Sequence, residues 1–184
     1  MKKITTKQLV VLAMFAAIAY ILMLVSRFLP PIVPAVEFLK YDPKDIMIVI
    51  SGMLFGVFGV VSTAIISSFL ELITVSTTGF FGFVMNVMSS ISFAILPTLL
   101  CRKKITIFKI VLGCVFAIIA QTAFMTLWNI IVSPYYMGVS RKVIMKLLKY
   151  FIQFNLIKSS INAIVTIIFF PSFKKILLNL KSRV

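Results

Sequence analysis

The feature that most constrains this chain is a long apolar stretch, residues 46–101, in which Glu71 is the only charged residue. The stretch is two to three times longer than the ~20 residues that one membrane-spanning helix needs, so the chain must fold back within it. Its apolar runs are continuous, whereas the strands of a membrane barrel alternate apolar and polar residues. Open strands leave backbone groups without partners in lipid. The stretch therefore predicts several membrane-spanning α-helices.

The composition of the whole chain supports the same class. Of 184 residues, 61% are hydrophobic and 12% are charged, and the mean hydropathy is +1.15. A soluble domain of this length could not bury so much apolar surface. We predict an all-α integral membrane protein, a six-transmembrane-helix bundle in one domain over residues 1–184.

The charge distribution predicts the orientation of the bundle. In a soluble chain, a net charge of +15 would suggest that the partner is nucleic acid. In a membrane protein, the positive-inside rule explains an excess of Lys and Arg. We therefore expect no nucleic acid partner. Three segments are rich in Lys and Arg: residues 2–7, 102–104 and 174–183. Six spans place all three segments on the same side of the membrane. We predict that this side is cytoplasmic and that both termini lie there. Seven cations remain on the external side, so the asymmetry is moderate. The predicted location is the cell membrane.

Helix-breaking residues set the expected boundaries of the spans. Prolines at positions 30, 134 and 171 are expected to follow spans one, five and six. A turn is expected near Gly56 and Gly59. The basic segment 141–149 is expected to lie on the membrane surface. The predicted spans are about 7–27, 45–55, 60–74, 84–100, 105–132 and 150–170.

The last predicted span contains one polar stripe. Asn155, Lys158, Ser159 and Asn162 stand at i, i+3, i+4 and i+7, so they lie on one face of a helix. A charge within a membrane is costly and marks a functional site by default. We predict that the stripe lines a ligand cavity. The alternative is a lysine that reaches the interface while the asparagines bond to neighbouring helices.

Other polar side chains extend the candidate site. Asn129, with Trp128 beside it, and Asn86 offer amide or indole groups to a ligand with mixed donors and acceptors, while Gln121 is a weaker candidate. Hydrogen bonds between helices, and an interfacial position for Trp128, are the alternatives. Glu71 is expected to pair with a basic residue, with ligand contact as the second option.

Small residues form two smooth helix faces. Ala13 and Ala17 lie one turn apart on the first span, and Gly52 and Gly56 do so on the second. Such faces let helices approach closely. They indicate either internal packing or a docking surface for another membrane subunit.

The sequence lacks the common catalytic motifs. It has no histidine, no phosphate-binding loop and no cluster with the spacing of metal ligands. We therefore expect neither an enzyme nor a cofactor or metal site. An outward-facing pocket without an energy source indicates a capture subunit that depends on partners.

Three segments of the sequence carry a family resemblance: Phe-Leu-Lys-Tyr-Asp-Pro-Lys-Asp at 38–45, Thr-Thr-Gly-Phe-Phe-Gly at 77–82 leading to Asn86, and Phe-Asn-Leu-Ile-Lys at 154–158. They resemble the riboflavin-specific substrate-binding (S) component of energy-coupling factor (ECF) vitamin transporters. The resemblance covers nearly the whole chain, and the last motif is its most specific part. Related members often have serine where Lys44 stands.

The resemblance implies a function and a set of partners. It implies a multi-pass, non-catalytic subunit that binds riboflavin, as transported ligand, in a pocket facing outside. It also implies assembly with a transmembrane coupling subunit and two cytoplasmic ATPases, with Ala13 and Ala17 as the docking face. Taken together with the polar stripe and its neighbours, the expected ligand-binding residues are Leu39, Tyr41, Asp42, Gly79, Asn86, Trp128, Asn129, Asn155, Lys158, Ser159 and Asn162.

Two alternatives to riboflavin binding stay open at this point. The first is an S component for another vitamin, such as thiamine or pantothenate. The second is a structural or assembly membrane protein without a small-molecule ligand, in which the polar stripe joins helices.

Overall fold

The computed structural model describes residues 5–102 and 104–183, with side chains as far as residue 174. These residues form six α-helices and one short 3-10 helix, η1 (Pro34–Val36), within the first long loop. The α-helices are α1 (Thr6–Ser26), α2 (Lys44–Phe55), α3 (Val57–Thr74), α4 (Gly79–Cys101), α5 (Ile107–Met137) and α6 (Arg141–Arg183).

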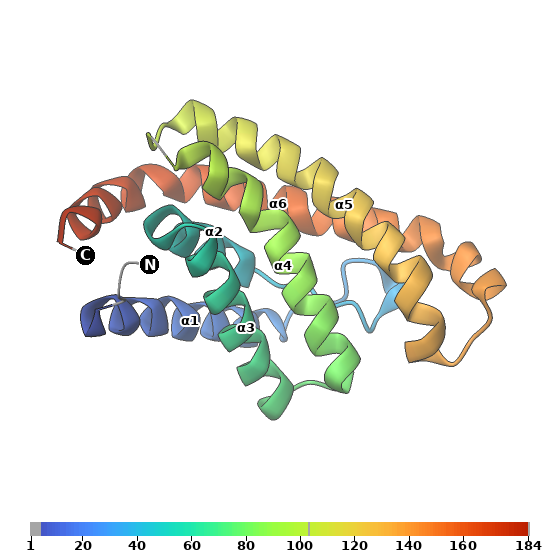
Figure 1. The fold of residues 1–184 in the computed structure, drawn as a ribbon. Helices are drawn as coiled ribbons and strands as arrows, with labels where there is room; N and C mark the ends of the chain where they lie inside the picture. Colours follow the sequence, from blue (N-terminus) through green and yellow to red (C-terminus); the bar gives the residue numbers. More distant parts are fainter. Residues whose placement is uncertain (1–4, 103, 184) are drawn as a thin grey trace.

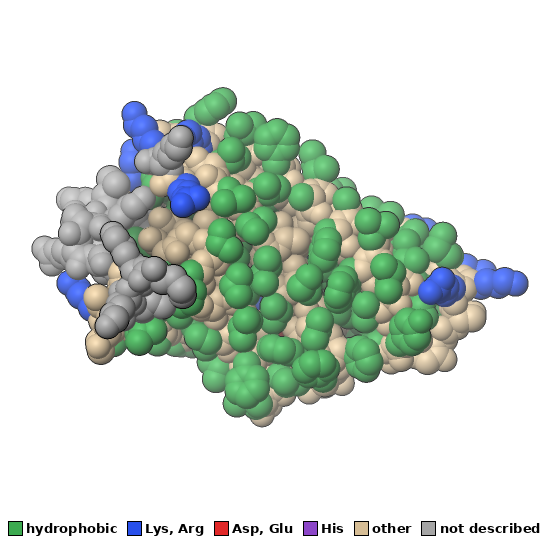
Figure 2. Space-filling model, viewed as in Figure 1, with side chains coloured by type: hydrophobic (Ala, Val, Ile, Leu, Met, Phe, Trp, Pro, Cys, Tyr) green, Lys and Arg blue, Asp and Glu red, His purple; other side chains and the backbone are tan. Residues whose placement is uncertain are grey.

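Five of these helices are long and apolar enough to cross a membrane, counting only the described residues: α1, α3, α4, α5 and α6. Many of their large hydrophobic side chains are exposed, as lipid-facing side chains are. Figure 2 shows hydrophobic side chains over the middle of one face and Lys and Arg at its two ends. This arrangement matches a hydrocarbon layer bounded by polar headgroups.

The short helix α2 forms the centre of the bundle. Its 12 residues are fewer than a spanning helix needs. Every residue from Lys44 to Met53 is buried, and α1, α3, α4 and α6 all pack against it. A helix that is buried on all sides does not need to face lipid, which explains why α2 can be so short.

The helices place the start of α1 and the end of α6 at the same end of the molecule. In Figure 1, α5 and α6 run side by side for most of their length, and these two helices are in extensive contact. The start of α1, the α4–α5 connection and the end of α6 lie at the same end of the molecule. The described members of the three predicted basic clusters, among them Lys7, Arg102 and Lys174, therefore lie toward the same end.

Two predicted proline boundaries were wrong. Helix α5 continues through Pro134 to Met137, and α6 continues through Pro171 to Arg183. A proline removes one backbone hydrogen bond, and neighbouring helices let a membrane helix tolerate that loss. The true end of α5 is Gly138, whose φ of 63° is left-handed and whose N–H donates to the carbonyl of Pro134.

The expected third external loop was also wrong. Only residues 138–140 connect α5 to α6, and residues 141–149 form the first turns of α6. The basic segment therefore continues a spanning helix and does not form a separate surface helix.

The remaining boundary differences are smaller. The turn between α2 and α3 is at Gly56 alone (φ 67°), and Gly59 lies inside α3. Helix α4 begins at Gly79, within the predicted second external loop. Glycine at 56 and 79 supplies the positive φ that each helix start uses.

Candidate ligand-binding site

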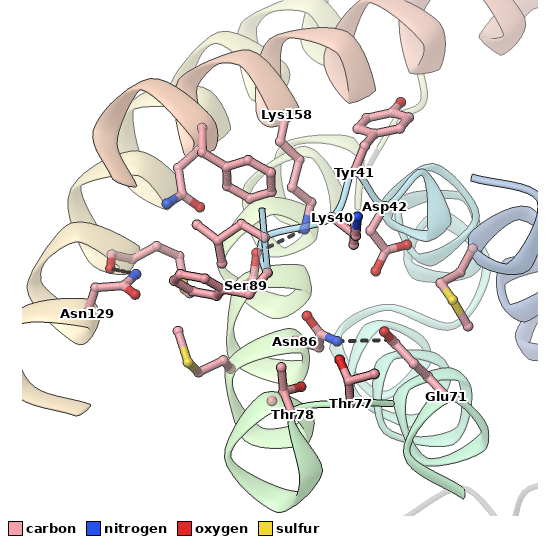
Figure 3. A pocket seen from close by; sticks show the side chains of 18 of the residues that line it. Lys40, Tyr41, Asp42, Glu71, Thr77, Thr78, Asn86, Ser89, Asn129 and Lys158 are labelled. Atoms are coloured by element: carbon pink, nitrogen blue, oxygen red, sulfur yellow. Dashed lines mark hydrogen bonds between the residues drawn. The ribbon is translucent and has the colours of Figure 1, made fainter. Parts of the chain in front are cut away.

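A pocket lies between the first loop and helices α3, α4, α5 and α6 (Figure 3). Its empty space is about 800 Å³, including open solvent at its mouth. The lining combines apolar and polar side chains. The apolar and aromatic members are Met23, Phe38, Leu39, Tyr41, Met85, Met125, Tyr136 and Phe154, with Gly82 among them. The polar and charged ones are Arg27, Lys40, Asp42, Glu71, Thr77, Thr78, Asn86, Ser89, Asn129, Asn155 and Lys158.

Two antiparallel helices supply the polar wall opposite the loop. Asn129 of α5 donates from Nδ2 to the carbonyl of Met125 at 2.7 Å, and Asn155 of α6 donates to the carbonyl of Phe151 at 2.8 Å. Each amide thus satisfies one donor within its own helix. The Asn155 Oδ1 atom accepts no hydrogen bond within the described part of the chain, so an acceptor stands ready at this wall.

Lys158 reaches the floor of the pocket from α6. Its Nζ atom lies 3.3 Å from Asp45 Oδ2 and 3.2 Å from Ser89 Oγ. Ser89 Oγ also accepts a 2.7 Å hydrogen bond from Gln121 Nε2. Lys158 and Asp45 are almost fully buried. The carboxylate therefore neutralises the ammonium, and Lys158 keeps one of its three N–H donors for a ligand.

A second group of charges closes the side of the pocket nearest α3. Lys44, fully buried, lies 2.6 Å from Asp42 Oδ2 and 2.8 Å from Glu71 Oε2. Arg27, at the end of α1, pairs with Glu71. Asn86 of α4 donates to Glu71 Oε2 at 2.9 Å, as the dashed line in Figure 3 marks. The predicted pairing of Glu71 with a basic residue is confirmed, and Glu71 lines the pocket as well.

The first loop is fastened to the bundle beside these charges. The Tyr41 hydroxyl donates to Asn162 Oδ1 at 2.8 Å, and Asn162 Nδ2 donates to the Asp42 carbonyl and to Asp45 Oδ2, both at 3.0 Å. Ser26 Oγ donates to the carbonyl of Tyr41 at 2.8 Å. The loop segment that lines the pocket is therefore held by α1 and α6.

Burial and charge set the ionisation of the loop residues. Burial, with the nearby Asp45 and Asp42 carboxylates, raises the pKa of Tyr41 to about 12, so its hydroxyl stays a donor. Burial alone would raise the pKa of Asp42. The ammonium groups of Lys44 and Lys158 outweigh that effect and hold the pKa of Asp42 below its usual value.

The structure brings seven of the eleven sequence-predicted ligand residues to the pocket wall: Leu39, Tyr41, Asp42, Asn86, Asn129, Asn155 and Lys158. The other four lie outside the lining. Asn162 fastens the loop, as described. Ser159 donates to the carbonyl of Asn155. Trp128 stacks on Phe124 at 5.8 Å between ring centroids, and Gly79 begins α4 with open space around it.

Several lining residues were not predicted as ligand contacts. Lys40, Thr77 and Thr78 come from the loop segments that the resemblance had marked, but they were not singled out. Arg27 could have been found from charge balance, because the lone acid Glu71 needs a cation. The methionine and aromatic members carry no signal that separates them from ordinary core residues.

The predicted docking residues lie elsewhere. Ala13 and Ala17 are on the exposed face of α1, whereas Ala16 and Ala19 on its other face are buried. Gly52 packs against Thr98 and Val60, so that glycine serves internal packing.

The fold and the site together define a helical membrane protein with a pocket of polar, charged and apolar side chains enclosed by its helices and a loop. A family model described as "ECF transporter, substrate-specific component" matches residues 7–170. The chain belongs to this family. Its members are transporter subunits, generally non-catalytic, and family membership implies association with the membrane and ATPase subunits of an ECF module.

A solved structure supports the fold. It is described as the S component of a bacterial ECF transporter, and it matches with a TM-score of 0.77 and 23% sequence identity. The match covers 93% of this chain and 97% of that chain. A comparison with curated proteins gave no match.

Proposed function

We propose that this chain is the riboflavin-binding subunit of an ECF transporter. The observation that carries the proposal is the convergence of Asn129, Asn155 and Lys158 on one pocket. These residues come from two helices and match the flavin-holding positions of the riboflavin-specific members that the sequence resembles.

The chemistry of the lining suits a flavin. The isoalloxazine ring has a broad apolar face, which the methionines and aromatic residues of the pocket can cover. Its pyrimidine-like edge alternates donors and acceptors, which asparagine amides match. The hydroxyl groups of the ribityl chain find polar partners in Asn86, Thr77 and Thr78 on the α3–α4 side.

The charge distribution disfavours a cationic vitamin. The cations Arg27, Lys44 and Lys158 are paired with the three acids Asp42, Asp45 and Glu71. A cationic ligand would therefore find no free carboxylate in the lining. Riboflavin is neutral and thiamine is a cation, so the pocket favours riboflavin over thiamine. Lys40 also lines the pocket and forms no ion pair among the described residues, so the comparison with pantothenate, an anion, is left to the competition experiment below.

The family context supplies the transport step. In this proposal the pocket opens to the outside of the cell membrane, riboflavin binds there, and an ECF module with its ATPases drives release inside. Ala13 and Ala17 form the face that meets the coupling subunit. The chain itself catalyses no reaction.

The test is direct measurement of flavin binding by the detergent-purified protein. Quenching of flavin fluorescence is expected on titration of the protein, and excess thiamine or pantothenate is expected not to reverse it. Asn155→Ala should weaken binding about tenfold, since one hydrogen bond to a ligand is lost. Gln153→Ala is the matched control, because Gln153 lies on the exposed face of the same helix.

Two results would contradict the proposal. One is an absence of flavin binding by a folded protein. The other is displacement of bound flavin by thiamine or pantothenate at similar concentrations, which would indicate a sister vitamin as the natural ligand.

A further inference from the structure

The first turns of α6 carry four cations on one face. Arg141, Lys142, Lys146 and Lys149 are all exposed. At 100° per residue they fall at about 0°, 100°, 140° and 80° around the helix axis, so they share one face about 140° wide. No acidic residue lies between positions 138 and 150. We call these four residues the α6 basic face.

The opposite side of the same turns is buried. Ile144, Phe151 and Phe154 belong to a cluster with Val33 and Val36 of the first loop. The α6 basic face therefore points away from the bundle and away from the ligand pocket, which none of its four residues lines.

The position of the basic face along α6 corresponds to lipid headgroups. The segment 150–170 contains Lys158 as its only charge, and its 21 residues span about 31 Å, close to the thickness of the hydrocarbon core. Lys149 and Lys146 then lie within ~6 Å of the core edge, in the headgroup layer. Arg141 and Lys142 lie ~12–14 Å beyond that edge, from where long side chains can bend back to the headgroups.

Apolar side chains accompany the cations. Met145 is 56% exposed and Ile152 is 39% exposed, and both fall within or beside the basic face. A surface that mixes long cationic and apolar side chains suits the boundary between acyl chains and headgroups better than open water.

The basic face has no internal counterion. Three of the four acids of the chain are used in the buried ion pairs of Asp42, Asp45 and Glu71, which leaves Glu37. None of the four cations forms an ion pair with any residue that the structure describes. The contact given for Lys149 is with the Tyr150 ring, at 4.8 Å from its centroid. Figure 2 shows Lys and Arg gathered at both ends of the molecule, with the apolar band between them.

We propose that the α6 basic face binds the headgroups of anionic phospholipids in the leaflet at this end of the molecule. The phosphate groups supply the counterions that the chain lacks, and the acyl chains cover Met145 and Ile152. This surface is separate from the ligand pocket and does not depend on the identity of the vitamin.

The test measures lipid binding by the full chain in detergent micelles. Phosphatidylglycerol is titrated as the anionic probe and phosphatidylcholine as the neutral one, with bound lipid counted by native mass spectrometry. The variant with Arg141, Lys142, Lys146 and Lys149 all replaced by Gln should bind phosphatidylglycerol at least about tenfold more weakly. It should bind phosphatidylcholine as the unmodified protein does.

Two controls separate charge from packing. A charge-conserving variant, with Arg141→Lys and the three lysines changed to Arg, should keep its affinity for phosphatidylglycerol. For the unmodified protein, raising the salt concentration should weaken binding of phosphatidylglycerol but not of phosphatidylcholine. This second measurement needs no variant, so the proposal remains testable even if the fourfold Gln variant does not fold.

Two results would overturn the proposal. The first is unchanged phosphatidylglycerol binding in the fourfold Gln variant, and the second is an equal loss for both lipids. If the first result is accompanied by slower association of a phosphorylated flavin with that variant, the basic face attracts anionic ligands instead of lipid headgroups.

Discussion

Individual charged residues explain how a membrane protein can hold so many ions around one pocket. Lys44 is fully buried, yet it lies within 2.6–2.8 Å of two carboxylates. Lys158 lies beside Asp45, which also accepts hydrogen bonds from Ser90 and Asn162. Each buried charge thus has a counterion and further hydrogen bonds, the condition under which buried ions are tolerated.

The first prediction concerns the buried cation Lys44. Lys44→Met would leave Asp42 without its nearest cation in a buried position, and loss of one partner of a buried pair costs about 3 kcal/mol or more. Unfolding in detergent should show that loss. Lys40→Met is the matched control, since Lys40 is part-buried in the loop just before α2 and forms no ion pair within the described residues. Equal stability of the two variants would contradict the prediction.

The second prediction concerns Tyr41 and alkaline pH. The folded protein holds the pKa of Tyr41 at about 12, against an ordinary value of 10.0. The neutral phenol therefore adds stability below pH 10, and this contribution is lost as the pH rises from 10 to 12. Stability of the unmodified protein should fall more steeply over that range than stability of Tyr41→Phe. Parallel curves for the two proteins would show that the phenol is not shifted.

Among the helices, close contacts depend on a few small or unusual residues. A Cβ atom on Gly113 of α5 would lie 2.7 Å from the Cα of Pro97 in α4, so these helices touch through their backbones. Membrane helices associate largely through such contacts, because lipid gives no hydrophobic force between them. Gly113 and Pro97 therefore set the distance between α4 and α5, both of which line the pocket.

The third prediction tests that contact. Gly113→Ala would push its methyl group against backbone atoms that cannot rotate away, and overpacking of this kind costs about 1–3 kcal/mol. Ala123→Val is the control, because it enlarges an exposed residue of the same helix. Thermal unfolding in detergent should show a clearly lower midpoint for Gly113→Ala. An equal or larger loss for Ala123→Val would contradict this explanation.

Helix positions could be predicted from the sequence better than helix ends. Apolar runs placed all six helices, because lipid leaves the backbone few other choices. The predicted ends at Pro134 and Pro171 were wrong, because the cost of a proline depends on neighbouring helices that a sequence pattern does not show. The extension of α6 to residues 141–149 was missed for the same reason, as the buried side of those turns packs on the first loop.

At the scale of the whole molecule, the candidate site was predictable in part. The stripe on α6 correctly indicated one face, but the pocket reaches Asn155 and Lys158 and not Asn162, which holds Tyr41 instead. Periodicity gives the face of a helix and not the depth at which a cavity ends. The pairing of Lys158 with Asp45 joins residues far apart in the chain, so it became visible only with the fold.

The last prediction concerns assembly of the subunit with its energising module. Family membership implies a membrane partner, and Ala13 and Ala17 offer it an exposed, shallow face on α1. Replacing both with Leu would fill that face and keep the partner helix from close approach. Copurification with the coupling subunit should fall several-fold. Under the proposed function, riboflavin affinity should stay unchanged, because neither residue lines the pocket.

The matched control for this variant is Ala123→Leu, which enlarges an exposed alanine on α5. It should leave copurification intact, since that position would face lipid and not the partner. Lipid can rearrange around an added side chain, whereas a packed helix cannot, so only the α1 variant should lose its partner. If both variants copurify equally well, Ala13 and Ala17 are lipid-facing and the coupling subunit docks on another face.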